Sequence, residues 1–375
     1  EFGTGATSAS SLTGGARPGT IVNKISVPSG PDVGPGALSS PTLVDTDLDG
    51  VVDIAYAGDE FGNLYRFDLR GDVNTWKATM IYKGDKTRPI TAAPTVYRND
   101  ENNYIVVFGT GSDVFKHDRR DAHQQMIAGI YDDLKVESPT ALNFGGLFTQ
   151  SYTGTDKERY IADAGFDKAR HKGWKIMLDP SVADKNGYFV GAEKVVSKPA
   201  MLLTTAFVPT RIYGSKDVET KLPPGVDKNK TCYESESSKD TKGTSWTMAI
   251  NVKNGAGPDL QNGGYYTDPQ GNPLELAGKN HQTITSGMNI IDAKKVEPTL
   301  SQQNGNGEYS TSGEATDLKE PNIPRNDCIA KTAVMENIQS TNDPQNPSGV
   351  SADSLGGKRC GDPSFTRGTK REIIL

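Results

Sequence analysis

The sequence predicts an all-β protein, for which a blade-like strand pair favours a β-propeller, and three observations lead to the all-β class. Hydrophobic residues form only 34% of the 375-residue chain, whereas glycine and proline number 41 and 22, as in proteins built from many strands and turns. Short runs rich in Val, Ile and aromatic residues recur throughout. Capped helical periodicity is nearly missing, and residues 158–172 form one weak helical candidate. Many strands without helices leave a sandwich, a barrel or a propeller.

The first candidate strands are residues 20–27, 51–57 and 64–69. The last two are joined by GDEFGN, whose Gly and Asn tolerate the positive φ that tight hairpin turns need. In LYRFDL, alternate positions create one apolar and aromatic face. This strand pair resembles the inner strands of a propeller blade.

The remaining candidate strands follow at intervals along the chain: residues 104–109, 126–131, 174–178, 194–197, 200–208, 246–252, 284–291 and 330–338. Two of them, in FGTGSDVFKHD and SWTMAINVKNG, faintly repeat the blade pattern. The strands suffice for four or five blades, which leaves open whether the ring closes within this chain.

Long polar segments separate the later strands. We expect surface excursions at about residues 216–244, 254–282 and 300–327, because these stretches are too polar to form a core and too long for simple hairpin loops. Residues 1–19 are small and polar, and we interpret them as a cloning remnant or a flexible lead-in. Residues 20–375 then form one propeller region.

Composition and motifs also exclude several functions. The net charge of −6 gives no electrostatic reason to expect nucleic acid as a partner, and no stretch has the apolar length of a transmembrane helix. The serines form no GxSxG elbow, the four histidines form no HExxH, and there is no P-loop. We therefore predict neither an enzyme nor a small-molecule substrate.

The three cysteines lack the CxxC spacing of zinc sites. Cys328 and Cys360 flank a polar stretch, where a disulfide would stabilise the fold by about 3–4 kcal/mol. The alternative is three free thiols in a reducing compartment. Cys232 has no evident partner in the sequence.

The most specific motif is DTDLDGVVD, residues 45–53, which follows the first three-quarters of an EF-hand calcium loop. Gly50 stands at position 6, where that loop turns sharply. The expected calcium (Ca²⁺) ligands are four carboxylates and one main-chain carbonyl, from Asp45, Asp47, Asp49, Asp53 and Val51. Oxygen ligands on a flexible loop favour calcium over zinc.

The loop also departs from an EF-hand. Position 12 is Tyr56 instead of a bidentate Glu, and a strand follows instead of a helix. We therefore expect weak affinity, with a dissociation constant on the order of 10⁻⁵–10⁻³ M. The alternative is an acidic, solvated turn that binds nothing.

A second short motif is the tripeptide RGD, formed by Arg70, Gly71 and Asp72 after the LYRFDL strand. Such a tripeptide can engage integrins, whose metal ion takes the Asp carboxylate. Three residues are a weak signal, and an ordinary charged turn is the competing interpretation.

The run DTDLDGVVDIAYAGDEFGNLYRFDL resembles the signature of type IV pilus tip adhesins and biogenesis factors of the PilC/PilY kind. Further segments resemble that family in the same order: VFGTGS, IYD, GWKIML, EKVVSKP, SWTMAIN and TKREI. Together they span most of the chain, although the polar excursions match no segment of the family.

The resemblance implies a modified, quinoprotein-like β-propeller from the C-terminal region of such a protein. It implies a location at the pilus tip or outer membrane surface, promotion of pilus extension against retraction, and adhesion to host cells. Minor pilins or the tip complex, and a host receptor, would be the partners. Calcium at the matching loop residues would tune this activity. The rival functions are a calcium-stabilised lectin or matrix-binding propeller and a quinoprotein-like enzyme.

Overall fold

The computed structural model describes residues 21–28, 36–100, 102–183, 188–216, 242–258, 266–267, 273–274, 276–281, 284–292, 328–338 and 350–360. The all-β prediction is confirmed, because these residues form strands and three short 3-10 helices: η1 (Val73–Thr75), η2 (Lys116–Arg120) and η3 (Phe144–Gly146). Within these ranges, no helix is long and apolar enough to cross a membrane.

Two five-stranded sheets come first in the chain, and each has four antiparallel strands and a parallel edge strand. The first sheet runs in the order β1 (Thr42–Val44), β2 (Ile54–Gly58), β3 (Leu64–Asp68), β4 (Lys77–Lys83) and β8 (Leu142–Asn143). The second runs in the order β5 (Thr95–Arg98), β6 (Asn103–Gly109), β7 (Met126–Asp133), β12 (Gly173–Met177) and β9 (Phe148–Gln150).

The third sheet has eight strands. Its order is β10 (Thr153–Gly154), β11 (Glu158–Tyr160), β20 (Leu276–His281), β17 (Lys242–Asn251), β16 (Thr205–Lys216), β14 (Tyr188–Val190) and β13 (Val182–Ala183), with β15 (Ala200–Leu202) also paired to β16. Two smaller sheets comprise β18 (Tyr266–Thr267) with β19 (Pro273–Leu274), and β21 (Ile284–Asp292) with β22 (Cys328–Ile338) and β23 (Val350–Cys360).

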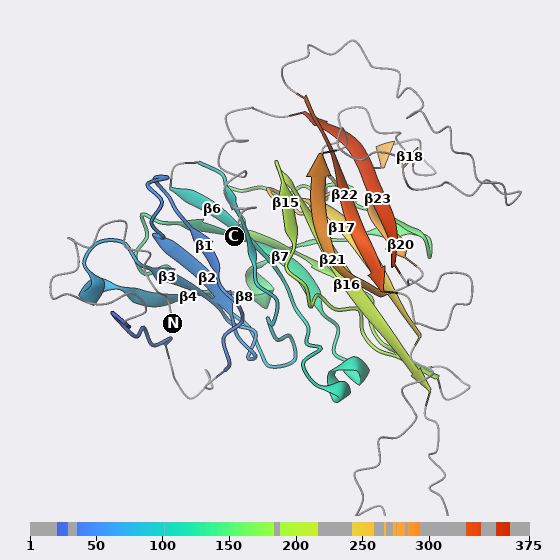
Figure 1. Ribbon diagram of the computed structural model, residues 1–375, viewed down its shortest axis with the longest axis horizontal. Helices are drawn as coiled ribbons and strands as arrows, with labels where there is room; N and C mark the ends of the chain where they lie inside the picture. The colour runs from blue at the N-terminus through green and yellow to red at the C-terminus, as the bar shows by residue number, and fades with distance from the viewer. Residues whose placement is uncertain are drawn as a thin grey trace, which may run out of the picture.

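The three large sheets stack face to face, with the second in the middle (Figure 1). In β6, Ile105 and Val107 pack in a core that includes Trp246 of the third sheet. Tyr104, Val106 and Phe108 pack in a separate core shared with the first sheet. Both faces of the strand are buried, which explains why YIVVFG is apolar without alternation.

This stacking is the arrangement of propeller blades. Strand β1 contacts β5, and β5 contacts β15, so inner strands of the three sheets adjoin one another. Within the described ranges the sheets do not close into a ring. Within the second blade, Gly129 of β7 faces its register partner Trp174 of β12, and a Cβ atom at this position would lie 2.4 Å from the Trp174 side chain.

Several sequence predictions are wrong in detail. Residues 21–27 form no strand, although Ile25 and Val27 pack on the first sheet. Residues 194–197 contribute only an isolated bridge, and residues 158–172 contain strand β11 and irregular chain instead of a helix. Residues 200–208 divide into β15 and β16 at a turn where Leu203 has φ 51°.

The predicted excursion at residues 254–282 is also partly wrong, because it contains β20, a strand in the interior of the third sheet. Ala277 is fully buried there. The excursion at 300–327, the interior of 216–244, the segment 1–19 and Cys232 lie outside the described residues.

A buried ion pair joins the first two blades. Arg66 of β3 donates to the Asp132 carboxylate of β7 at 2.8 Å, and their side chains are 0% and 2% exposed. Tyr56 of β2 donates to the other oxygen of Asp132 at 2.8 Å. Burial raises the pKa of the Asp132 carboxyl above its ordinary value, and Arg66 and the Tyr56 hydroxyl oppose that rise. Arg66 also donates to the carbonyls of Val136 and Glu137.

A second buried arginine joins the second and third blades. Arg159 of β11 makes a bidentate pair with Glu193, with both N–O distances 2.8 Å, and contacts Asp179 beyond β12 at 2.5 Å. Its guanidinium lies between the rings of Tyr152 and Trp246, at 4.3 and 3.8 Å from their centroids. Glu193 lies between β14 and β15 of the same sheet as β11, so the Asp179 contact is the ion pair of Arg159 that crosses to the second blade, as the Arg66–Asp132 pair crosses between the first two.

The first prediction concerns the Arg66–Asp132 pair. Asp132→Ala leaves the Arg66 guanidinium buried without its carboxylate, so we expect the free energy of unfolding to fall by about 3–5 kcal/mol. Equilibrium denaturation measures this loss. Lys77→Ala, which removes an exposed ion pair with Glu137, is the control and should cost less than about 1 kcal/mol. Equal effects of the two changes would contradict the proposed importance of the buried pair.

The second prediction concerns the cysteines. The register of β22 and β23 makes Cys328 and Cys360 direct cross-strand partners, a placement that suits a disulfide. We expect non-reducing peptide mapping of protein from an oxidising compartment to recover the two cysteines in one linked peptide pair. Recovery of both as alkylated thiols would leave the free-thiol alternative.

Candidate calcium loop

The candidate site is the loop that connects β1 to β2 at the edge of the first blade. The antiparallel register pairs Val44 with Ile54, so the two ends of the loop are held together by the sheet. The main-chain N–H of Asp53 donates to the Val44 carbonyl at 3.0 Å and closes the base of the loop. The loop's position therefore depends on the strand pairing of the blade.

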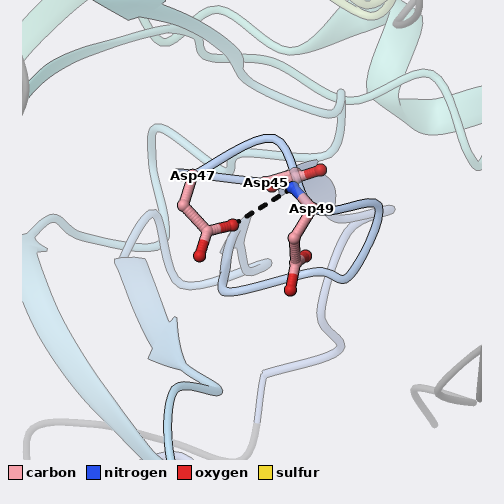
Figure 2. Close-up of side chains that lie close together, drawn as sticks. All are labelled: Asp45, Asp47 and Asp49. Atoms are coloured by element: carbon pink, nitrogen blue, oxygen red, sulfur yellow. Dashed lines mark hydrogen bonds between the residues drawn. The ribbon is translucent and has the colours of Figure 1, made fainter.

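Three of the predicted ligands converge. Carboxylate oxygens of Asp45, Asp47 and Asp49 lie within 4.8 Å of one another, and Figure 2 shows their side chains gathered on one side of the loop. Asp45 is half-buried, whereas Asp47 and Asp49 are exposed. Among the described residues this is the one group of three or more metal-ligating side chains.

The carboxylates also organise the main chain. Asp45 accepts hydrogen bonds from the N–H groups of Leu48 at 2.6 Å, Asp49 at 3.2 Å and Gly50 at 2.8 Å. Asp47 accepts one from Asp49 at 3.2 Å, drawn as the dashed line in Figure 2. Asp49 accepts one from Val51 at 2.7 Å. The loop is thus preformed by its own acidic side chains.

Two positive φ angles produce the turn. Gly50 has φ 93°, in agreement with the glycine expected at position 6. Leu48 has φ 65°, a conformation that costs a non-glycine residue about 1–2 kcal/mol. Its side chain is 54% exposed, so packing does not enforce this conformation. The hydrogen bond from the Leu48 N–H group to Asp45 enforces this conformation, so the loop is conformationally constrained.

Asp53 has a different environment from the other three aspartates. Its carboxylate is not part of the group, and its Oδ2 accepts hydrogen bonds from the Thr46 N–H and hydroxyl. Position 9 of calcium loops commonly reaches the ion through a water molecule, so this placement fits a loop of that kind. Tyr56, at position 12, is fully buried and bonded to Asp132, which explains why no ligand comes from there.

The donor set fits a calcium ion. All the converging atoms are carboxylate oxygens, which hard divalent cations prefer, and the exposed side of the loop leaves room for water ligands. The carboxylate oxygens lie within 4.8 Å of one another, a separation at which two unit charges in water repel by about 1 kcal/mol. That repulsion is small enough for the loop to exist without an ion and is relieved when a cation binds.

The RGD tripeptide follows strand β3, and two of its side chains form local hydrogen bonds. Arg70 forms a bidentate pair with Asp68, with N–O distances of 2.9 and 2.6 Å. Although burial alone would raise it, these hydrogen bonds hold the pKa of the Asp68 carboxyl below its ordinary value. Asp72 caps η1 through Asn74, and Gly71 has φ 75°. Integrin binding stays a prediction.

Two histidines and two tryptophans have contacts or burial typical of structural residues. His123 contacts Asp121, and His281 is buried against Thr247. Trp174 and Trp246 are core residues. Sequence reasoning missed Thr46, whose only signal is its place at position 2 of the loop, and the Arg159 cluster, whose members are far apart in the chain.

Comparison with known proteins places these features in a family context. Residues 11–164 match the sequence model of the PilY1 beta-propeller domain. The type IV pilus biogenesis factor PilY1 of Pseudomonas aeruginosa strain PAO1 is 36% identical over a segment that covers 30% of this chain and 12% of that protein. A PilY1 homolog of Xylella fastidiosa is 25% identical over 52% of this chain and 15% of its own length.

A solved structure supports the fold. The crystal structure of the P. aeruginosa PilY1 C-terminal domain superposes with a TM-score of 0.55, at 20% identity, over 74% of this chain and 61% of that one. This chain therefore covers 12–15% of the length of these two relatives in sequence, and 61% of the solved P. aeruginosa domain in fold.

The third prediction separates two roles of the aspartates. Asp45→Ala removes the acceptor for three main-chain N–H groups, whereas Asp47→Ala removes one long hydrogen bond. Both variants relieve the repulsion of two carboxylate pairs, so we expect the ion-free Asp45→Ala protein to be less stable than Asp47→Ala by about 1–2 kcal/mol. Thermal denaturation in excess chelator measures both. A larger loss for Asp47→Ala would contradict the hydrogen-bond pattern.

Proposed function

We propose that this chain, a PilY1-type β-propeller region, acts in type IV pilus biogenesis and that one calcium ion bound at the Asp45–Asp53 loop controls that action. The observation that carries the proposal is the group of three carboxylates in a preformed loop, within the segment that matches the PilY1 family. The two relatives compared above are named as a type IV pilus biogenesis factor and a homolog of it.

The finer points extend beyond the matched part of those relatives, since it covers 12–15% of their length. We propose that the protein is extracellular, at the pilus tip or on the outer membrane surface. There it promotes pilus extension against retraction and contributes to adhesion to host cells. Its partners are minor pilins or the tip complex and a host surface receptor, and it acts by binding instead of catalysis.

The calcium ion would be held by the Asp45, Asp47 and Asp49 carboxylates, with the Val51 carbonyl and Asp53 completing the shell together with water. Bound calcium neutralises the acidic group and fixes the loop at the edge of the first blade. Its expected affinity is weak, on the order of 10⁻⁵–10⁻³ M, which suits a response to extracellular calcium.

The fourth prediction tests the ion and its use. We expect isothermal titration calorimetry to show one calcium site in the wild type and none up to millimolar calcium in Asp45→Ala/Asp49→Ala. In cells that lack the native gene, the same variant should fail to restore calcium-dependent surface piliation and twitching. The mechanism is loss of two of the three converging carboxylates.

Asp100→Ala is the matched control, because Asp100 also accepts main-chain hydrogen bonds in an exposed turn, from Asn102 and Asn103, without belonging to the acidic group. It should leave calcium binding and piliation intact. No heat of binding to the wild-type protein would reject the calcium site. Normal piliation by the double variant would leave calcium with a structural role alone.

A further inference from the structure

We propose that Thr46, which is not itself a ligand, sets the calcium affinity of the loop by holding Asp53 in position. The proposal rests on the calcium site proposed above and assigns a positioning residue to it. Thr46 lies between Asp45 and Asp47 in the sequence, and both of its polar donors bond to Asp53 at the far end of the loop.

The contact joins Thr46 at position 2 of the loop to Asp53 at position 9. The Thr46 N–H donates to Asp53 Oδ2 at 2.7 Å, and the Thr46 hydroxyl donates to the same oxygen at 2.5 Å. The main chain of Asp53 is fixed as well, since its N–H bonds to the Val44 carbonyl and its carbonyl accepts from the Leu69 N–H at 2.8 Å. Asp53 is therefore anchored to the strands on either side and to the start of the loop.

This anchoring determines what the Asp53 carboxylate can offer an ion. Oδ2 is occupied by Thr46, whereas Oδ1 accepts no hydrogen bond from the part of the chain that the structure describes. The carboxylate lies outside the group of three, at the place where a calcium loop uses an ordered water. Fixing Oδ2 leaves Oδ1 with one orientation, so the entropy of ordering that side chain is lost before the ion arrives.

Removing the hydroxyl has a defined consequence. In Thr46→Val the side chain keeps its shape, but the Asp53 carboxylate loses one of two donors and gains rotational freedom. The net value of one hydrogen bond to a charged group then appears as a calcium dissociation constant weaker by roughly tenfold. Thr46→Ser keeps the donor and should remain within about threefold of the wild type.

A matched control exists in the connection between β4 and β5. Thr87 donates from its N–H and its hydroxyl to one carboxylate oxygen of Asp85, in a turn with no acidic group nearby. Thr87→Val removes an equivalent contact, so it reports the effect of such a contact on stability alone. It should leave the calcium dissociation constant unchanged.

The fifth prediction is the test, in which calcium is titrated by calorimetry into the full chain of each variant, with melting temperatures measured in chelator. We expect the wild type, Thr87→Val and Thr46→Ser to have similar calcium dissociation constants. The dissociation constant of Thr46→Val should be roughly tenfold higher. Thr46→Ala removes the same hydroxyl and provides a second measurement if the valine variant folds poorly.

The outcomes separate this inference from the proposed function. Calcium binding by Thr46→Val and Thr46→Ala within twofold of the wild type overturns the role of Thr46 and leaves the calcium site standing. Weakening of Thr46→Ser and Thr46→Val to the same extent also overturns it, since the hydroxyl would then be irrelevant. Absence of binding to the wild type rejects the calcium site itself.

Discussion

The stacking of the blades depends on two buried arginines. The side chains of Arg66 and Arg159 are almost fully buried, and each pairs with a carboxylate of the neighbouring sheet, Asp132 and Asp179 respectively. A buried guanidinium without its partner is strongly destabilising, so these pairs allow one relative placement of neighbouring blades and penalise others. Apolar packing supplies the area of each junction, and the ion pairs fix its register.

The calcium loop inherits its geometry from this arrangement. Tyr56 occupies the place where an EF-hand would have its last ligand, but its hydroxyl serves the Arg66–Asp132 pair. Strand β2, which follows the loop, therefore contributes Tyr56 to the junction between the first two blades. The candidate ion site therefore has only the ligands of the loop itself. An EF-hand gains rigidity from two flanking helices, whereas this loop is held by β1, β2 and β3. Asp53, tied to Val44 and Leu69, is the residue through which the strands hold the loop.

The sequence indicated the blades best where local chemistry decides the structure. The GDEFGN turn was predictable because Asp59 accepts hydrogen bonds from Phe61, Asn63 and Tyr65, and Gly62 takes φ 77°. The acidic spacing of the loop was equally local. Strand β20 was missed because its LAGKNH sequence reads as a polar excursion, and only pairing with β11 and β17 makes it a strand. Thr46 and Arg159 acquire their roles from partners seven or more residues away, which no local pattern encodes.

The preformed loop also has a consequence for time. Because Asp45 and its neighbours already hold the main chain in a turn through their own hydrogen bonds, the proposed calcium ion would enter without a slow folding step. Its capture would then proceed at the rate of diffusion and of exchange of the ion's water shell, and the weak affinity expected from the sequence would correspond to rapid release. Under the proposed function, such a loop would follow changes in the surrounding calcium concentration without delay and would retain no memory of earlier exposure.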